Sequence, residues 1–163
     1  MKKIINPWRN HPEYNLKTNN MKYLKLFFRL LLGLFMTYAG FSHLTFNLQE
    51  FVAQVPTWLQ FSPEFTDFVV LASGVVEIAF GIGILFLVSK WRAIAGALLA
   101  LFYVAIFPGN INQYVNHIDA FGLNTDQARL IRLFFQPVLI FLALWTTGGW
   151  KYWKLWAKGK FKE

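Results

Sequence analysis

A single ionisable residue, Glu77, lies near the middle of an apolar stretch of about 22 residues that runs from Phe68 to Ser89. About 20 residues at a rise of 1.5 Å each cross the roughly 30 Å hydrocarbon core of a bilayer, so the stretch has the length of a membrane span. A carboxylate at that depth costs about 2.5–3.5 kcal/mol on insertion scales and normally faces protein or water. Gly74, Glu77 and Gly81 follow at i, i+3 and i+7, which predicts that the acid lies on a small-residue face open to another helix.

Five more polar side chains in or beside apolar stretches are candidates for the same site. In order of increasing depth, counted at about 1.5 Å per residue from the nearer boundary, they are His43, Asn110, Arg132, Gln136 and Tyr103. The first three lie near one boundary, and Tyr103 reaches about the depth of Glu77, roughly 15 Å in. We therefore expect the four apolar segments to contribute polar groups to one wedge that opens outward.

Each candidate also has a structural alternative. Glu77 could serve only to join helices, although ionisable groups inside a membrane are functional by default. Arg132 lies within snorkelling range of the interface, so it is either an anchor or a partner of Glu77 or of a ligand. His43 is more often a hydrogen-bonded histidine than a metal or haem ligand, and His117 lies in a loop.

No catalytic signature accompanies these residues. The sequence has no nucleophile–base pair, no phosphate-binding glycine loop and no second acid near Glu77. Zero cysteines exclude disulfides, thiol redox catalysis and cysteine-ligated metals. We expect a protein with no catalytic activity of its own, no bound metal and no covalently bound cofactor.

The apolar pattern predicts an all-α fold, a bundle of four transmembrane helices at about 23–46, 68–89, 93–111 and 130–150. Residues 1–22 form a polar lead-in, and residues 151–163 form a basic, aromatic tail typical of a membrane interface. The segment between the first two spans is expected to cap the bundle at the membrane surface. Pro108-Gly109-Asn110 should break or loosen the end of the third span.

The positive charges predict the orientation. The net charge is +8, but Lys and Arg concentrate near the chain ends and in the short loop Ser89–Arg92, which argues against binding of nucleic acid. With four spans nearly all of them fall on one side, whereas the other side keeps Arg129 and Arg132 beside several acids. The positive-inside rule then predicts that both termini are cytoplasmic. Arg29-x3-Gly33 and Arg92-x3-Gly96 also open the first and third spans alike, a weak echo of a repeat.

A set of short motifs resembles the DoxX-like family of small four-helix bacterial membrane proteins over about residues 25–150. The motifs are Arg29-x3-Gly33-x6-Gly40-x2-His43, Val55-Pro56-Thr57-Trp58-Leu59, Ser73-Gly74-Val75-Val76-Glu77-Ile78, Phe107-Pro108-Gly109-Asn110-Ile111 and Arg132-x3-Gln136-Pro137. The resemblance implies a four-span protein of the bacterial inner membrane. Some members are implied to be quinone-linked subunits of sulfur-compound oxidation or partners of soluble redox enzymes. The chain departs from the family where Pro-Ala-Asn is usual, and it lacks the cysteine pairs of related disulfide-handling groups.

From the residues and the resemblance together we expect an accessory membrane subunit that binds a small apolar molecule, such as a quinone, and associates with a redox protein. Glu77 would be neutral and donate one hydrogen bond, since desolvation disfavours the carboxylate. Two alternatives stay open: a small-molecule or proton-coupled transporter in which Glu77 titrates, and a scaffold that binds no ligand and holds partners and anionic lipid. A homo-oligomer is also open.

Overall fold

The computed structural model describes residues 12–157, with the side chains of residues 12–18, 153 and 155–157 left out. The start of the predicted lead-in, up to residue 11, and the end of the predicted tail, from residue 158, lie outside the described residues. The described chain is all-helical and contains no strand, which confirms the predicted fold class. Its elements are α1 (Pro12–Leu44), α2 (Leu48–Gln54), the 3-10 turn η2 (Thr57–Leu59), α3 (Pro63–Phe86), α4 (Ser89–Val115), α5 (Asp126–Thr147) and α6 (Gly149–Ala157).

Four helical segments are long and apolar enough to cross a bilayer, namely Asn19–Leu44, Pro63–Phe86, Ser89–Val115 and Asp126–Thr147. The chain is therefore a multi-pass membrane protein. The expected limits of the spans were wrong by up to five residues, because polar residues such as Glu64, Lys90 and Asn112 continue a helix once its apolar turns have formed it. The first helix also begins at Pro12, well inside the lead-in that was expected before residue 23.

The expected break at Pro108 does not occur, since α4 continues through Pro108 to Val115. Proline cannot donate a backbone hydrogen bond to the carbonyl of Val104, one turn earlier. Transmembrane helices tolerate this loss where neighbouring helices supply partners for the freed backbone groups.

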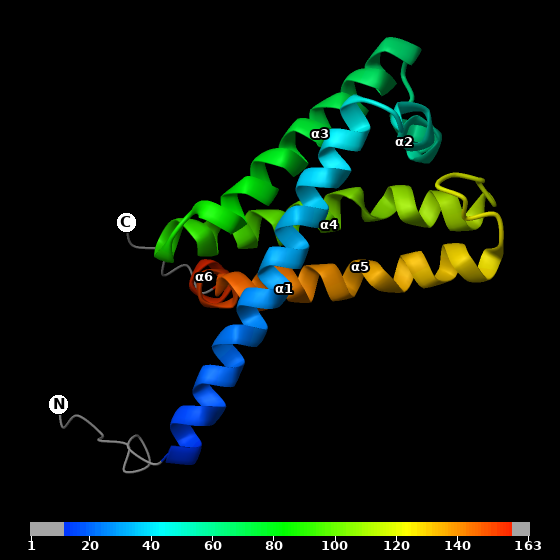
Figure 1. The fold of residues 1–163 in the computed structure, drawn as a ribbon. Helices are drawn as coiled ribbons and strands as arrows, with labels where there is room; N and C mark the ends of the chain where they lie inside the picture. Colours follow the sequence, from blue (N-terminus) through cyan, green and yellow to red (C-terminus); the bar gives the residue numbers. More distant parts are fainter. Residues whose placement is uncertain (1–11, 158–163) are drawn as a thin grey trace.

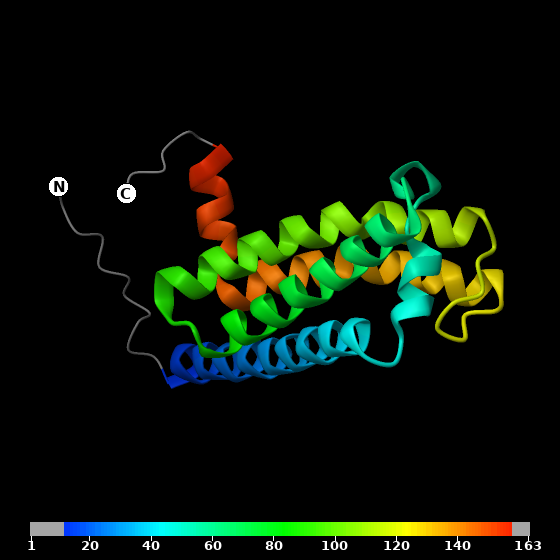
Figure 2. The same ribbon diagram turned by 90° about the horizontal axis from the view of Figure 1, so that it is seen from above.

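The spans form two antiparallel pairs that cross each other (Figure 1). Helix α1 packs along α3, and α4 packs along α5. The pairs diverge toward one end, where α2 lies between them beside the loop of residues 116–125 (Figure 1). We call this the cap end, and we call the opposite end, which carries the short α3–α4 connection at Leu87–Val88, the turn end. Helix α6 leaves the turn end at a steep angle to the bundle (Figure 2).

Glycines set the close approach of α1 and α3. A Cβ atom on Gly74 would lie 2.9 Å from the carbonyl oxygen of Gly40 and 2.7 Å from the Cβ atom of His43. A Cβ atom on Gly81 would lie 2.8 Å from the carbonyl oxygen of Gly33. Small residues at both crossings let the two backbones touch, as is usual for helices in a membrane. Glu77, between Gly74 and Gly81, is buried at this interface as its spacing predicts.

Hydrogen bonds hold the connecting loop at the cap end. Arg129 is 5% exposed, and it donates to the carboxylates of Asp119 and Asp126 and to the carbonyl of Ile118. Gln113, which is also buried, donates to the carbonyls of Ile118 and Ala120. These contacts tie the 116–125 loop to α4 and α5, so the loop forms a defined wall above the space between the helix pairs.

Candidate ligand-binding pocket

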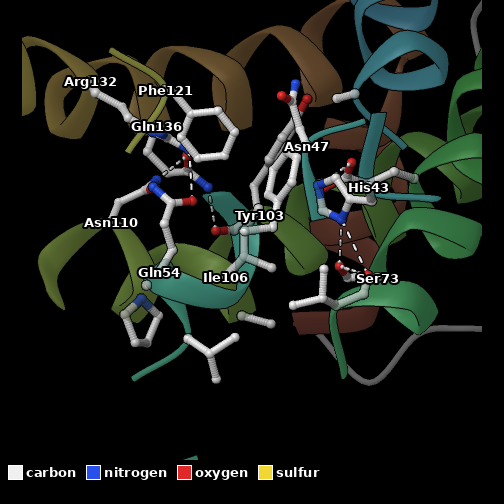
Figure 3. A pocket seen from close by; sticks show the side chains of 18 of the residues that line it. His43, Asn47, Gln54, Ser73, Tyr103, Ile106, Asn110, Phe121, Arg132 and Gln136 are labelled. Atoms are coloured by element: carbon white, nitrogen blue, oxygen red, sulfur yellow. Dashed lines mark hydrogen bonds and ion pairs between the residues drawn. The ribbon is translucent and has the colours of Figure 1, made fainter. Parts of the chain in front are cut away.

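A cavity of about 630 Å³ lies between the two helix pairs in the cap half of the bundle. Its walls come from α1, α3, α4 and α5, with α2, η2 and the 116–125 loop closing the cap side. All six residues singled out from the sequence line this cavity, namely Glu77 and the five that Figure 3 labels, His43, Tyr103, Asn110, Arg132 and Gln136. The divergence of the helix pairs thus produces the wedge that the sequence predicts.

His43 and Glu77 form the polar floor between α1 and α3. The Nε2 atom of His43 lies 3.3 Å from the Oε2 atom of Glu77, and both side chains are less than a tenth exposed. That distance permits an ion pair, but the angle is not that of a hydrogen bond, and both atoms lack a hydrogen-bond partner. Two buried polar atoms therefore lie side by side with unused hydrogen-bonding capacity, in side chains that line the cavity.

This pairing corrects the depths counted from the sequence, which placed His43 at the membrane boundary and Glu77 about 15 Å below it. The Cα–Cβ bonds of a helix tilt toward its N-terminus, so side chains on antiparallel helices lean in opposite directions. His43 leans toward the turn end and Glu77 toward the cap end, since α1 and α3 run oppositely. His43 is level with Gly74, since a Cβ atom there would lie 2.7 Å from His43 Cβ, so Glu77 is only three residues, about 4.5 Å, further along α3. The opposite tilts then close this remaining gap.

The hydrogen bonds of His43 define its tautomer. Its Nδ1 atom lies 3.0 Å from Ser73 Oγ and 3.2 Å from the carbonyl oxygen of Val70, while the Ser73 hydroxyl donates to that carbonyl. A carbonyl only accepts, so Nδ1 carries a proton, an assignment that rests on the hydrogen-bond network. Nε2 of a neutral His43 is then an acceptor facing Glu77. The pair is neutral overall when it holds one further proton, on the carboxyl or on the imidazole.

A chain of amides crosses the opposite wall, between α4 and α5. Asn110 Nδ2 donates to Gln136 Oε1 at 2.8 Å, and Gln136 Nε2 donates to the backbone carbonyl of Tyr103 at 2.7 Å (Figure 3). This carbonyl adjoins the turn that Pro108 deprives of a backbone donor. The Tyr103 hydroxyl donates to the sulfur of Met36 at 2.8 Å, which links this wall to α1. Three of the candidate residues therefore act as one hydrogen-bonded unit.

Arg132 closes the cap side through contacts inside the protein. Its Nη2 atom donates to Gln54 Oε1 at 3.0 Å, and Gln54 Nε2 donates to Gln113 Oε1 at 2.5 Å. Its guanidinium lies 4.5 Å from the ring centre of Phe121, within the range of a cation–π contact. No hydrogen bond or ion pair joins Arg132 to Glu77 among the described residues. Of the two roles that the sequence left open for Arg132, the contacts favour a position in the pocket wall over a headgroup anchor.

Aromatic rings join Arg132 back to His43. The ring centres of Phe51 and Phe121 are 4.5 Å apart, and those of His43 and Phe51 are 3.3 Å apart. Sequence reasoning missed Phe51, Gln54 and Phe121, because it treated the connecting segments as a surface cap. Nothing in an isolated loop sequence shows that its side chains turn into a bundle.

The rim of the cavity is apolar and exposed. Phe35 and Tyr38 on α1, and Ile131 and Phe135 on α5, line the cavity and are each more than half exposed. Exposed apolar side chains at this depth face the hydrocarbon of the bilayer. The cavity therefore opens sideways, between α1 and α5, toward the lipid.

The arrangement can bind a molecule and share a proton with it. No group of three or more His, Asp or Glu side chains in the described part of the chain is placed to hold a metal ion. The floor offers a carboxyl and an imidazole nitrogen, the walls offer amides and a guanidinium, and the rim is apolar. This is the usual composition of a small-molecule site, in which a few polar groups orient a mostly apolar ligand.

Fold and site together define a four-helix membrane protein with an internal, laterally open pocket. Residues 32–147 match the family described as Domain of unknown function (DUF8561), and the chain belongs to this family. No curated protein matches the chain, and no solved structure matches it.

Proposed function

We propose that this protein is a membrane subunit that binds a small, mainly apolar molecule carrying a carbonyl or hydroxyl group, such as a quinone. The observation that carries the proposal is the His43–Glu77 pair at the floor of a 630 Å³ cavity, whose facing atoms Nε2 and Oε2 are buried and have no hydrogen bond. Leaving a buried polar group without a hydrogen bond costs about 1–3 kcal/mol. A ligand that supplies the missing partner recovers this free energy.

The chemistry of the floor selects the ligand. A protonated Glu77 can donate to a ligand carbonyl, and Nε2 of neutral His43 can accept from a ligand hydroxyl. A quinone and its quinol carry these two groups in turn on a flat apolar ring. The cavity lies within the 300–1,000 Å³ typical of ligand sites. The apolar rim between Phe35 and Phe135 supports entry from the bilayer, where such molecules dissolve.

The charge distribution supports an orientation with both termini in the cytoplasm and the cap end outside, in a bacterial inner membrane. Reporter fusions after Lys90 and after Trp150 should then report cytoplasm, and fusions after Gln54 or Asn116 should report periplasm. A periplasmic report from the fusion after Trp150 would contradict this orientation. The DoxX-like resemblance adds the hypothesis that the subunit associates with a redox enzyme, without catalysis of its own.

Ligand binding can be tested on the purified full chain in detergent. A short-chain ubiquinone and menadione should raise its melting temperature, with decylbenzene as an apolar control that lacks oxygen. Glu77→Gln keeps the shape and a donor and should retain most of the shift, whereas Glu77→Leu should fold but lose it. Glu64→Gln, at an exposed acid on the same helix, is the matched control. No shift with either quinone, or an equal shift in Glu77→Leu, would overturn the proposal.

One observation favours a second candidate, a proton-coupled carrier: the His43–Glu77 pair is neutral when it holds a single transferable proton. Proteoliposome flux under a pH gradient separates the two. For a carrier, Glu77→Gln should preserve binding but abolish the response of flux to the gradient. For a binding subunit, the wild-type protein should show no flux above protein-free vesicles.

A further inference from the structure

Arg29 on α1 and Arg92 on α4 lie at the turn end, away from the pocket. In both, the Nε atom is fully buried and has no hydrogen-bond partner, and neither arginine forms an ion pair among the described residues. Two half-buried arginines at the same end of the bundle without an anion are an incomplete arrangement, since buried charges in proteins are paired.

Among the described residues, no acidic side chain lies at the turn end to supply a counter-charge. The described acidic side chains all belong to the cap half of the bundle or to its centre: Glu50, Glu64, Asp67, Glu77, Asp119 and Asp126. Helix α4 begins at Ser89 without a side-chain cap and has no acid in its first turn. Its unpaired N–H groups and helix dipole therefore add positive potential beside Arg92.

The two arginines are held in place by the same local pattern. Gly33 lies one turn after Arg29 and packs against Leu85 of α3, where a Cβ atom would lie 2.5 Å from Leu85 Cγ. Arg29 is about 6 Å nearer the turn end, and so level with the α3–α4 connection. Gly96 lies one turn after Arg92 and packs against Thr147 of α5. Each arginine thus continues the packed face of its helix by one turn toward the turn end, and Arg92 lies four residues after the α3–α4 connection with which Arg29 is level.

We propose that Arg29 and Arg92 bind a phosphate group at the turn end of the bundle. Guanidinium groups bind phosphate oxygens through paired, charge-assisted hydrogen bonds, and the buried Nε atoms have the donors that such a group needs. The phosphate can belong to an anionic lipid headgroup or to a free anion. The site is separate from the cap-half pocket and does not depend on the function proposed for it.

Purified full-length protein in neutral detergent allows a direct test. Phosphatidylglycerol, phosphatidylcholine and inorganic phosphate are added separately, and binding is followed by native mass spectrometry and by the shift in melting temperature. Phosphatidylglycerol should bind and stabilise, and the double variant Arg29→Gln/Arg92→Gln should weaken that binding by about tenfold or more, as expected for two charge-assisted contacts. Without added anion the double variant should melt no lower than wild type, because it loses two unpaired charges.

The matched control is Lys22→Gln/Lys151→Gln, which removes the same charge from two exposed lysines. It should bind phosphatidylglycerol as the wild type does. Stabilisation by inorganic phosphate that the arginine variant abolishes would identify a free anion as the occupant. Equal binding by the wild type and the arginine variant, or an equal loss in the lysine control, would overturn the site and leave only a general attraction of the basic end for anions.

Discussion

The two ends of the bundle use arginine in opposite ways. At the cap end, Arg129 bonds to Asp119, Asp126 and Ile118, and Arg132 bonds to Gln54 and contacts the Phe121 ring. At the turn end, Arg29 and Arg92 have no such partners among the described residues. The comparison teaches that burial alone does not assign a role to a charged residue. The chain itself satisfies the donors of Arg129, whereas the donors of Arg29 and Arg92 are left free for the anion that we propose they bind.

The largest expected effect is at Arg129. Replacing it by Leu removes hydrogen bonds of a buried, charged donor, each worth about 1.5–3 kcal/mol. The carboxylates of Asp119 and Asp126 are mostly exposed and stay solvated, so the total loss should lie near that range rather than at a multiple of it. We expect a lower free energy of unfolding in detergent titrations and faster proteolysis of the 116–125 loop. Unchanged stability and proteolysis would show that the cap end does not depend on its internal ion pairs.

Gln136 should rank next. Gln136→Leu breaks the bonds to Asn110 and to the Tyr103 carbonyl and leaves both groups buried without a partner, at a cost of about 1–3 kcal/mol. Asn110→Leu, made alone and together with Gln136→Leu, completes a double-mutant cycle measured by the free energy of unfolding. The double variant should lose less free energy of unfolding than the two single variants lose in sum, because each substitution removes the same Asn110–Gln136 hydrogen bond. Additive losses would show that the amides do not act as a unit.

Substitutions of Arg132 test whether a residue of the cap end also contributes to ligand binding in the pocket. Arg132→Lys should reduce quinone binding more than stability, because a point charge cannot reproduce the guanidinium fork that reaches Gln54 while lying on Phe121. The expected loss of stability is about 1 kcal/mol or less for one hydrogen bond and one cation–π contact. If Arg132→Lys and Arg132→Gln both leave stability and binding unchanged, Arg132 is an anchor and does not belong to the site.

The smallest effect is expected at Arg29. In detergent without anionic lipid, Arg29→Gln should change the free energy of unfolding by no more than about 0.5 kcal/mol, or should raise it slightly, since no internal partner is lost. The same measurement on Arg129→Gln supplies the contrast. If Arg29→Gln lowers the free energy of unfolding as much as Arg129→Gln does, Arg29 has stabilising contacts within the chain and the proposed difference between the two ends is wrong.

Much of the fold could be predicted from the sequence. In a bilayer every backbone group must be bonded within its own segment, so length and apolarity suffice to define the four helices. The spacing of Gly74, Glu77 and Gly81 also predicted which face of α3 is buried, because the helical period alone decides which residues share a face. A count of residues from the boundary assigned the six polar residues to one wedge, and all six line the cavity that the crossing of the helix pairs leaves.

The partners within that wedge were decided by the tertiary structure. Counting residues kept His43 and Glu77 apart, yet the crossing of α1 and α3 sets His43 against Gly74, one turn from Glu77, and the two side chains lie 3.3 Å apart. The sequence offered Glu77 or a ligand as the partner of Arg132. In the structure the partner is Gln54 of α2, a short helix outside the four spans, whose position the spacing of residues in the spans does not predict. Periodicity fixes the rotation of each residue about its own helix, but the distance between two helices depends on how they cross, and that is set by contacts such as Gly40 on Gly74.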